Sequence, residues 1–344
     1  MQRILKPRRP LVGAFIGLAF ISLLVWALRD LPFQEISVTL QRLSLLQLLA
    51  LFTLNAFIFL LFSSRWWLIL LAQGFRLPYF ALSGYRLSAF SVSYFTPGTQ
   101  FGGEPLQVHW LQNRHAVPGP NAMAAVALDK LFELMANFTF LAAGLLLAFR
   151  ESHLAANVGP AVLVPIAMLL ALPLVYLLAL WAGRFPLTAL ASHLPRRLLE
   201  LPALQKAIPW FTESERHIRG LIRHKPLAIL GVLALSGLVW ALLLVEYWLS
   251  LLLLGVQINL EQTIAALTAA RLAFLTPLPG GIGALEAGQV LAMQAMGIHP
   301  AVGISLSLLI RARDISFGLL GLLLAGMFAR SHQVAAPTPA QVGD

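Results

Sequence analysis

Six long apolar runs decide what this chain can fold into. They occupy residues 11–28, 45–62, 123–149, 161–182, 227–254 and 301–328. Each run is about long enough to cross a hydrocarbon core of roughly 30 Å as a helix that rises about 1.5 Å per residue. Only 11% of the 344 residues are charged and 59% are hydrophobic, whereas soluble domains carry about 25% charged residues. We therefore predict an all-α polytopic membrane protein.

Two short segments interrupt the apolar pattern in a similar way. Residues 95–104 and residues 275–286 each contain a proline- and glycine-rich break, followed by Glu104 in the first and Glu286 in the second. Backbone that cannot stay helical is tolerated at membrane depth only where it is buried in protein or lines a cavity. One break in each half of the chain therefore indicates a site built from discontinuous helices.

Basic residues predict which loops face the cytoplasm. The net charge is +10, and the densest group of Lys and Arg lies in the central segment 183–226. By the positive-inside rule this segment is cytoplasmic, and so is the basic stretch before the first apolar run. The positive charge thus has a membrane explanation, and we expect no nucleic-acid partner.

This orientation constrains the two broken segments. If residues 79–95 crossed the bilayer fully, the central segment would end on the outer side, against the charge pattern. The conflict disappears if residues 79–111 and 263–297 are re-entrant half-helix hairpins that enter from opposite faces and return. We predict about six full transmembrane helices plus these two hairpins, in an inverted-repeat-like arrangement. Ten ordinary crossings are the alternative.

We expect one integral membrane domain over residues 1–330. Within it, the central segment 183–226 is predicted to form short amphipathic helices on the cytoplasmic membrane surface. The Ala- and Pro-rich residues 331–344 are predicted to be a disordered tail.

Ionisable residues inside apolar stretches are functional candidates. Those in this chain are Arg86, Glu104, Asp129, Lys130, Glu133, Glu246, Arg271, Glu286, Arg311, Arg313 and Asp314. Because acids and bases are nearly balanced in number, we expect them to pair with one another in the interior. Asp129 and Glu133 share a helix face with Lys130 close by, and we assign these three, with Arg86 and Glu246, to a charge network. The alternative is that such pairs only clamp helices together.

A headgroup site is predicted where cations and helix starts coincide. New helices are expected after Gly103 and Gly283, and their free N–H groups suit an anion. We predict that a polar or anionic lipid headgroup is bound by Arg271, Arg311, Arg313, Glu104, Glu286, Asp314, Gly103, Gly281 and Gly283.

Other patterns carry less weight. No residues have metal-ligand spacing and no Walker sequence is present, so we predict neither metal nor cofactor. Arg65, which precedes two tryptophans, is interpreted as part of an interfacial belt.

Several of these motifs, in this order, resemble the flippase-like family that includes the transmembrane part of lysylphosphatidylglycerol synthases. The matching features are Arg65-Trp66, Thr96-Pro97-Gly98, Gly102-Gly103-Glu104-Pro105, Ala127-Leu128-Asp129-Lys130 with Glu133-Leu134, and the glycine-rich run from Pro277 to Glu286. Arg311-Ala-Arg-Asp314 is similar to a subgroup found beside hopanoid-synthesis genes. The resemblance covers about residues 10–330 and implies a membrane part that moves lipid.

The resemblance has two departures. Many relatives carry an arginine shortly after the first Gly-Gly-Glu segment, near the place where this chain has Gln107. No sequence corresponding to a soluble aminoacyl-transferase domain is present, so lysine transfer is not implied.

The leading hypothesis is a translocase in the bacterial inner membrane, with both termini cytoplasmic, acting on a phospholipid, hopanoid or polyprenyl phosphate. Energy would come from an ion gradient or from the lipid gradient. A membrane-embedded enzyme of lipid or isoprenoid metabolism is a second hypothesis, and a scaffold for such enzymes is a third. Partners other than lipid would be a second copy of the chain or lipid-synthesis proteins.

Overall fold

The computed structural model describes residues 43–96, 102–151, 155–195, 200–276, 279–281 and 283–330. Every regular element in these ranges is helical, which confirms the predicted all-α class. The predicted first span, residues 11–28, and the predicted tail, residues 331–344, lie outside the described residues.

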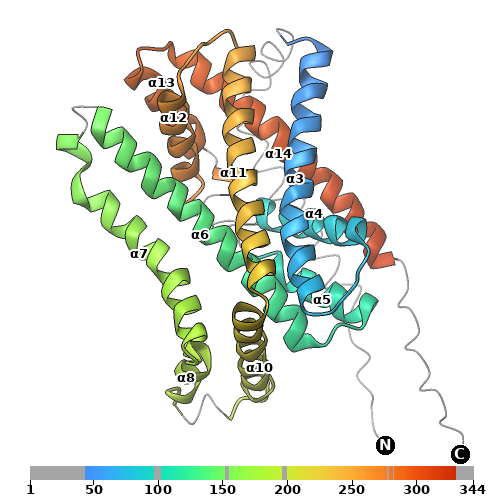
Figure 1. The fold of residues 1–344 in the computed structure, drawn as a ribbon. Coiled ribbons are helices and arrows are strands. Elements are labelled where there is room, and N and C mark those ends of the chain that lie inside the picture. Colours follow the sequence, from blue (N-terminus) through green and yellow to red (C-terminus); the bar gives the residue numbers. More distant parts are fainter. Residues whose placement is uncertain are drawn as a thin grey trace, which may run out of the picture.

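Five long helices form the body of the molecule (Figure 1). They are α3 (Leu45–Ala72), α6 (Gly119–Glu151), α7 (Ala155–Trp181), α11 (Pro226–Leu253) and α14 (Pro300–Arg330). The first four contain stretches that are long and apolar enough to cross a membrane. Helix α14 has 31 residues, about 46 Å of helix, but it carries Arg311, Arg313 and Asp314 near its middle.

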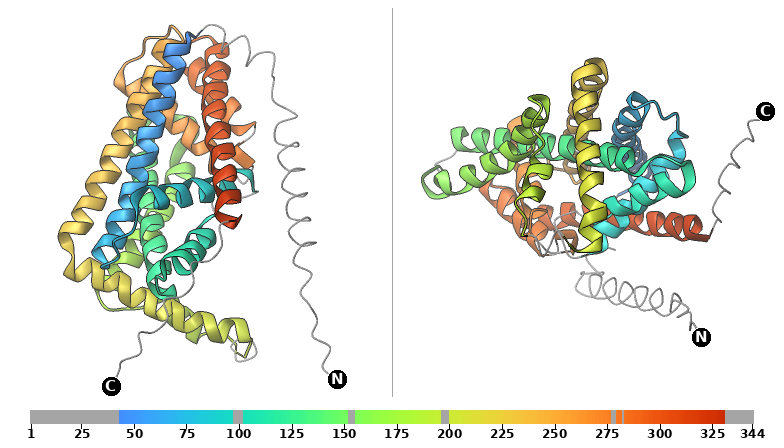
Figure 2. Two further views of the ribbon diagram at one scale, coloured as in Figure 1. Left: turned by 90° about the vertical axis from the view of Figure 1, so that its right-hand side faces the viewer. Right: turned by 90° about the horizontal axis from the view of Figure 1, so that it is seen from below.

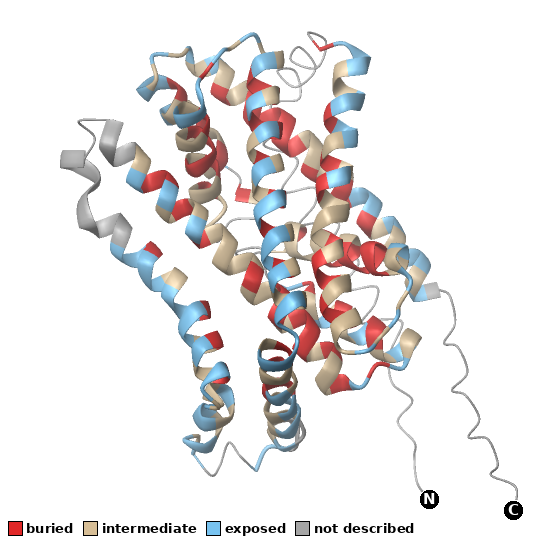
Figure 3. Ribbon diagram, in the orientation of Figure 1, coloured by how far each residue is buried: buried red, intermediate tan, exposed pale blue. Residues whose placement is uncertain are grey.

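The outer faces of these helices are apolar where a soluble protein would be polar. On α7, for example, Met168, Leu172 and Val175 are each at least 60% exposed. Buried residues concentrate between the helices, while exposed ones follow their outward faces (Figure 3). A large exposed apolar surface of this kind marks contact with lipid. The chain is therefore a multi-pass membrane protein.

Each predicted break separates two short helices. The first pair is α4 (Tyr79–Phe95) and α5 (Glu104–His115), and the second is α12 (Leu260–Ala273) and α13 (Ala284–Ala295), with a short 3-10 turn η1 (Pro279–Gly281) before α13. These helices have 12 to 17 residues, fewer than the roughly 20 that a full crossing needs. Their length argues against the alternative of ten ordinary crossings. Residues 97–101, 277–278 and 282 of the two breaks lie outside the described residues.

The two short-helix hairpins lie at opposite ends of the bundle. Figures 1 and 2 show α12 and α13 toward one end, and α4 and α5 toward the other. Their inner ends meet, because a Cβ on Gly280 of η1 would lie 3.0 Å from the ring of Tyr94 on α4. This is the arrangement expected of two hairpins that approach from opposite faces. Their entry into a bilayer as re-entrant segments stays a prediction.

The central segment contains α8 (Pro186–Ser192) and α10 (Pro202–His224), at the same end of the bundle as α4 and α5 (Figure 1). Buried Glu215 joins them: it accepts hydrogen bonds from the N–H groups of Leu187 and Thr188, from the Thr188 hydroxyl and from Tyr176 of α7. The segment is thus helical, as predicted for residues 183–226. Its position on a membrane surface stays a prediction.

Candidate functional site

A cavity of about 560 Å³ lies between the two hairpins. Its wall is built from α3, α4, α5, α6, α7, α11, α12 and α14, so residues far apart in the sequence meet around it. The volume is within the range of roughly 300–1,000 Å³ that is typical of ligand pockets. Charged side chains line one part of the wall, and Leu and Phe line another.

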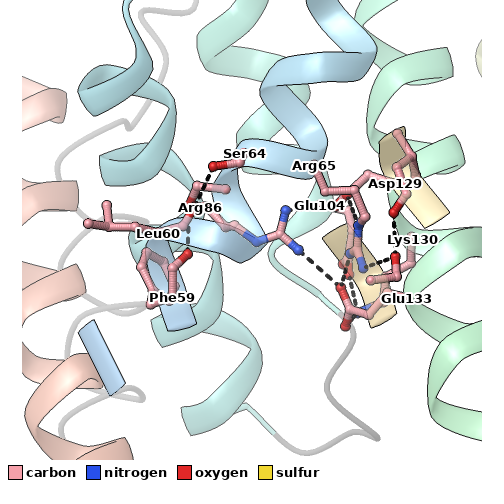
Figure 4. Close-up of polar contacts among 12 residues, drawn as sticks. Phe59, Leu60, Ser64, Arg65, Arg86, Glu104, Asp129, Lys130 and Glu133 are labelled. Carbon is pink, nitrogen blue, oxygen red and sulfur yellow. Dashed lines mark hydrogen bonds and ion pairs between the residues drawn. The ribbon is translucent and has the colours of Figure 1, made fainter. Parts of the chain in front are cut away.

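The first charge cluster consists of Arg65, Arg86, Glu104, Asp129, Lys130 and Glu133. Figure 4 shows these side chains together, with buried Asp129 on α6 among them. Its two carboxylate oxygens accept hydrogen bonds from Arg65 at 2.6 Å and from Arg86 at 2.7 Å. Since Arg65 is on α3, Arg86 on α4 and Asp129 on α6, this carboxylate holds three helices at one point.

Glu133 connects the rest of the first charge cluster. It lies one helical turn beyond Asp129 and pairs with Arg65 at 3.4 Å, Arg86 at 3.2 Å and Lys130 at 3.0 Å. Lys130 also pairs with Glu104 of α5 at 3.3 Å. The side chains of Glu104 and Glu133 remain 26% and 29% exposed. The cluster therefore clamps helices and also presents carboxylate surface to the cavity.

The second charge cluster consists of Asn55, Glu246, Arg313 and Asp314. Arg313 pairs with Asp314 at 2.8 Å and with Glu246 at 3.5 Å, and it donates a hydrogen bond to the Asn55 side-chain oxygen at 3.2 Å. The Asn55 amide in turn donates to Glu246 at 3.1 Å. Arg313, Asp314 and Asn55 line the cavity, and Glu246 supports them from behind.

Arg271 lies between the two clusters and differs from the other lining cations. It is half-buried on α12, and its guanidinium lies 5.0 Å from the ring centre of Trp240. Among the residues that the structure describes, none forms an ion pair or hydrogen bond with it. It does interact electrostatically with Glu133 of the first cluster and with Arg313, Asp314 and Glu246 of the second.

Arg311 and Glu286, in contrast, lie outside the cavity lining. Arg311 binds both oxygens of Glu286 and donates to the carbonyl groups of Gly280 and Gly281 at 3.2 and 3.3 Å. Its side chain is only 3% exposed. Arg311 thus holds the second break in place, whereas the sequence suggested that it contacts a ligand.

The three predicted glycines also have different positions. Gly103 lines the cavity, and a Cβ there would lie 2.1 Å from the Ala89 carbonyl oxygen, so the contact of α5 with α4 requires glycine. Gly281 and Gly283 have φ of +63° and +79°, a region that favours glycine. They shape the turn that Arg311 holds and do not line the cavity.

Sequence reasoning missed the role of Arg65. The interpretation of Arg65 as part of an interfacial belt is wrong. Its side chain is 2% exposed and pairs with Asp129, and Trp66 beside it is fully buried. Helix α3 continues to Ala72, past the end of the apolar run at Phe62. The available signal was the apolar sequence on both sides of Arg65. Asn55 and Tyr94 also line the cavity and were not predicted.

The fold and the site thus place the chain in a class: helical membrane proteins with a charged cavity between two hairpins. The chain matches the family described as the lysylphosphatidylglycerol synthase TM region over residues 12–323. It therefore belongs to this lipid-related membrane family, which confirms the predicted resemblance. A comparison with curated proteins gives no match.

Proposed function

We propose that this protein moves a membrane lipid across the bilayer. The polar headgroup occupies the cavity, and the acyl chains stay in the surrounding lipid. Membership of a lipid-related family supports a lipid substrate. The cavity supports a polar headgroup, because ionisable groups held inside a membrane protein mark substrate or ion pathways.

The observation that carries the proposal is the position of Arg271. Every other cation that lines the cavity has a carboxylate within 3.5 Å among the described residues. Arg271 has none, although it is close enough to both clusters to interact with their carboxylates electrostatically. A guanidinium with no carboxylate bound to it among the described residues suits the planar, two-point binding of a phosphate. Arg313, across the cavity wall on α14, provides a second positive group.

The apolar part of the cavity supports a lateral path for acyl chains. Leu172 of α7 lines the cavity and is 67% exposed, and Met168 and Val175 of the same helix, which do not line it, are 64% and 60% exposed. Leu169 and Pro173 of α7 line the cavity beside Leu172, and Trp240 and Leu243 of α11 continue the wall. The cavity wall is thus continuous with a surface suited to lipid, and a headgroup can enter while its chains remain outside.

This chemistry favours a lipid with a phosphate in its headgroup. Phospholipids and polyprenyl phosphates meet that requirement, and a hopanoid does so only when its polar end carries an anionic group. Glu104, Glu133 and Asp314 would contact donor groups of the headgroup, and Arg311 and Glu286 would hold the second hairpin. We place the protein in the bacterial inner membrane with both termini in the cytoplasm, which agrees with the basic central segment.

The test is translocation in proteoliposomes. Fluorescent phosphatidylglycerol and a fluorescent glycosyl diacylglycerol, which has a polar headgroup without phosphate, are followed by chemical quenching of the outer leaflet. Arg271→Gln is expected to slow phosphatidylglycerol movement about ten-fold or more, since a hydrogen bond to a charged group contributes roughly 1.5–3 kcal/mol and 1.4 kcal/mol is a factor of ten. Stability should change little, because Arg271 has no ion pair to lose among the described residues.

Arg216→Gln is the matched control, because Arg216 is an exposed arginine of α10 that does not line the cavity. It should leave the rate unchanged. The proposal is wrong if Arg271→Gln combined with Arg313→Gln moves phosphatidylglycerol as fast as the unmodified protein. Equal rates for the two lipids would show that phosphate is not recognised.

A further inference from the structure

The helices of the two halves of the chain repeat with a nearly constant offset. Helices α3 and α11 both have 28 residues and begin 181 residues apart, at Leu45 and Pro226. The next helices, α4 and α12, also begin 181 residues apart, at Tyr79 and Leu260. Helices α6 and α14 keep the same offset, and α5 and α13, of 12 residues each, differ from it by one.

Polar residues repeat in the same register. Lys130 and Glu133 of α6 correspond to Arg311 and Asp314 of α14, each pair three residues apart and 181 residues from its counterpart. Arg65 of α3 corresponds to Glu246 of α11 at the same offset. In the hairpins, Glu104 and Gln107 correspond to Glu286 and Gln289 with an offset of 182, and both glutamines are buried.

Interactions repeat as well. Glu104 accepts the N–H of Gly102 at 2.8 Å and pairs with Lys130. Glu286 accepts the N–H of Gly283 at 2.9 Å and pairs with Arg311.

Contacts between the halves follow the same rule. Asn55 of the first half binds Glu246 of the second half at 3.1 Å. The counterpart of Asn55 is Ser236, and the counterpart of Glu246 is Arg65. These two residues also bind each other, at 3.4 Å. A two-fold axis that exchanges the halves reproduces this pattern.

The two halves are inverted relative to one another. In Figure 1, α3 runs from the end of the bundle near α13 toward α5, whereas α11 begins beside α10 and runs the opposite way. The hairpins lie at opposite ends, as an axis across the long direction of the bundle requires. Inverted repeats of this kind place a substrate site where the repeats meet, which is where the cavity lies.

The present conformation breaks this symmetry. Glu104, Lys130 and Glu133 line the cavity, whereas of their counterparts only Asp314 reaches it. Helix α14 packs on α4 through Gly321, where a Cβ would lie 2.2 Å from the Leu87 carbonyl oxygen. The counterpart of Gly321 in α6, 181 residues earlier, is Phe140, and α6 packs on α12 one turn later, through Gly144, where a Cβ would lie 1.9 Å from the Thr268 hydroxyl oxygen.

We infer that Glu286, Arg311 and Asp314 form a second polar station, equivalent to Glu104, Lys130 and Glu133, which opens when the first station closes. This inference rests on the proposed function in one respect: the group that passes from one station to the other is the lipid headgroup. In the second conformation α4 separates from α14, α12 packs on α6 along more of its length than at Gly144 and Thr268, and the cavity opens beside the second hairpin. The exchange is the population shift expected of two nearly equivalent packings of an inverted repeat.

The chain offers matched reporters for this exchange. It contains no cysteine, so a single introduced cysteine is the only thiol. Ala89 of α4 and its counterpart 181 residues later, Ala270 of α12, are 4% and 2% exposed, but only Ala89 lines the cavity. In nanodiscs of phosphatidylglycerol and phosphatidylcholine, Ala89→Cys should therefore react with a small water-soluble thiosulfonate that enters the cavity. Ala270→Cys should react about ten-fold more slowly or less, because a minor conformation is populated at roughly 10% or below.

Two substitutions should then change the labelling rates of the two cysteines in opposite directions. Arg311→Lys weakens the grip on Glu286 and on the two glycine carbonyls, and Gly321→Ala wedges the seam between α4 and α14. Each should accelerate labelling of Ala270→Cys about five-fold and slow labelling of Ala89→Cys, as a population shift requires. Adding Lys130→Gln, which prevents closure of the first station, should cancel both effects of Arg311→Lys.

Faster labelling at 270 without slower labelling at 89 would show local loosening and would overturn the inference. Unchanged labelling of Ala270→Cys in both variants would overturn it too. Using two unrelated perturbations keeps the test decisive if one variant does not fold. Labelling requires no lipid movement, so this inference and the translocation proposal fail independently: loss of the reciprocal labelling leaves the effect of Arg271→Gln on transport untouched.

Discussion

The two hairpins use the same ion pair in different ways. In each, a glutamate near the start of the second short helix accepts a backbone N–H of a glycine in the break. It also pairs with a cation of the following long helix, Lys130 for Glu104 and Arg311 for Glu286. The carboxylates are equally exposed, at 26% and 27%, but Lys130 is 17% exposed and Arg311 only 3%. The two ion pairs therefore differ in their cation: Lys130 lines the cavity with its glutamate, whereas Arg311 is buried behind it.

The chemistry of the two cations explains the difference. The planar guanidinium of Arg311 provides donors for both oxygens of Glu286 and for two glycine carbonyls at once. The ammonium of Lys130 is a compact charge on a flexible stem, and it is shared between Glu104 and Glu133. The first arrangement fixes a turn, whereas the second can exchange one partner for a ligand.

The largest expected effect is on the ion pair of Arg311 and Glu286 at the second break. Arg311→Gln leaves Glu286 without its cation and the carbonyl groups of half-buried Gly280 and buried Gly281 without a donor. Because Glu286 is 27% exposed, we expect a loss of about 3 kcal/mol in the free energy of unfolding, at the low end for a broken buried ion pair. Arg311→Lys should lose less, because one oxygen of Glu286 can still be paired. Denaturation in mild detergent, followed by tryptophan fluorescence, measures both. A loss below 1 kcal/mol for Arg311→Gln would mean that Arg311 does not hold the second break.

The corresponding change at Lys130, which pairs with Glu104 at the first break, should affect function more than stability. Lys130→Gln is expected to cost about 1–2 kcal/mol, because Glu133 keeps Arg65 and Arg86 as partners and Glu104 faces the cavity. Headgroup translocation should nevertheless fall about ten-fold, since the charge that would exchange with the ligand is gone. Lys130→Arg is the control and should retain most of the activity. If Lys130→Gln destabilises the protein as strongly as Arg311→Gln does, Lys130 holds the first break as firmly as Arg311 holds the second, and the proposed difference between the two cations is wrong.

The glycine seam between α4 and α14 gives a smaller and more local test. Gly321→Ala places a methyl group 2.0 Å from the Ser91 hydroxyl oxygen and 2.2 Å from the Leu87 carbonyl oxygen, so the helices must shift, at a cost of about 1–3 kcal/mol. Gly326→Ala, five residues further along the same helix, meets nothing within 4 Å and should be neutral or slightly stabilising. Thermal unfolding of the two variants side by side measures the difference. Equal stability would show that the seam is loose.

The sequence predicts the hairpins but not their different roles. Proline and glycine after Phe95 and after Leu275 cannot continue a helix, so the breaks and the short helices follow from local chemistry. Arg311 and Arg313 are only two residues apart, and nothing local shows that one faces the second break and the other the cavity. Their separation depends on how α14 is rotated against α4 and α13, which is a tertiary property.

The register of the repeat is also a property that the sequence alone does not reveal. The two broken segments are similar enough to suggest an inverted repeat, but the register needs the helix bounds. Arg65 and Glu246 have opposite charges, so no comparison of residue types pairs them, and only their shared place in α3 and α11 does. The asymmetry between Gly321 and Phe140 becomes meaningful only after that register is known.

The smallest expected effect concerns Arg271, the lining cation that lies between the two charge clusters. Trp240 supports Arg271 from one side by a cation–π contact at 5.0 Å, an interaction worth about 0.5–2 kcal/mol. Trp240→Leu keeps an apolar wall but removes this support, so Arg271 becomes less ordered, and the apparent affinity for phosphatidylglycerol should fall about two- to ten-fold with little change in the maximal rate. Trp240→Phe, which retains a ring, should have an intermediate effect, and Trp248→Leu, at an exposed tryptophan of the same helix, should have none. Saturation curves in proteoliposomes distinguish these variants. If Trp240→Leu lowers the maximal rate and leaves the affinity unchanged, Arg271 acts during the passage between the stations and not in holding the headgroup at rest.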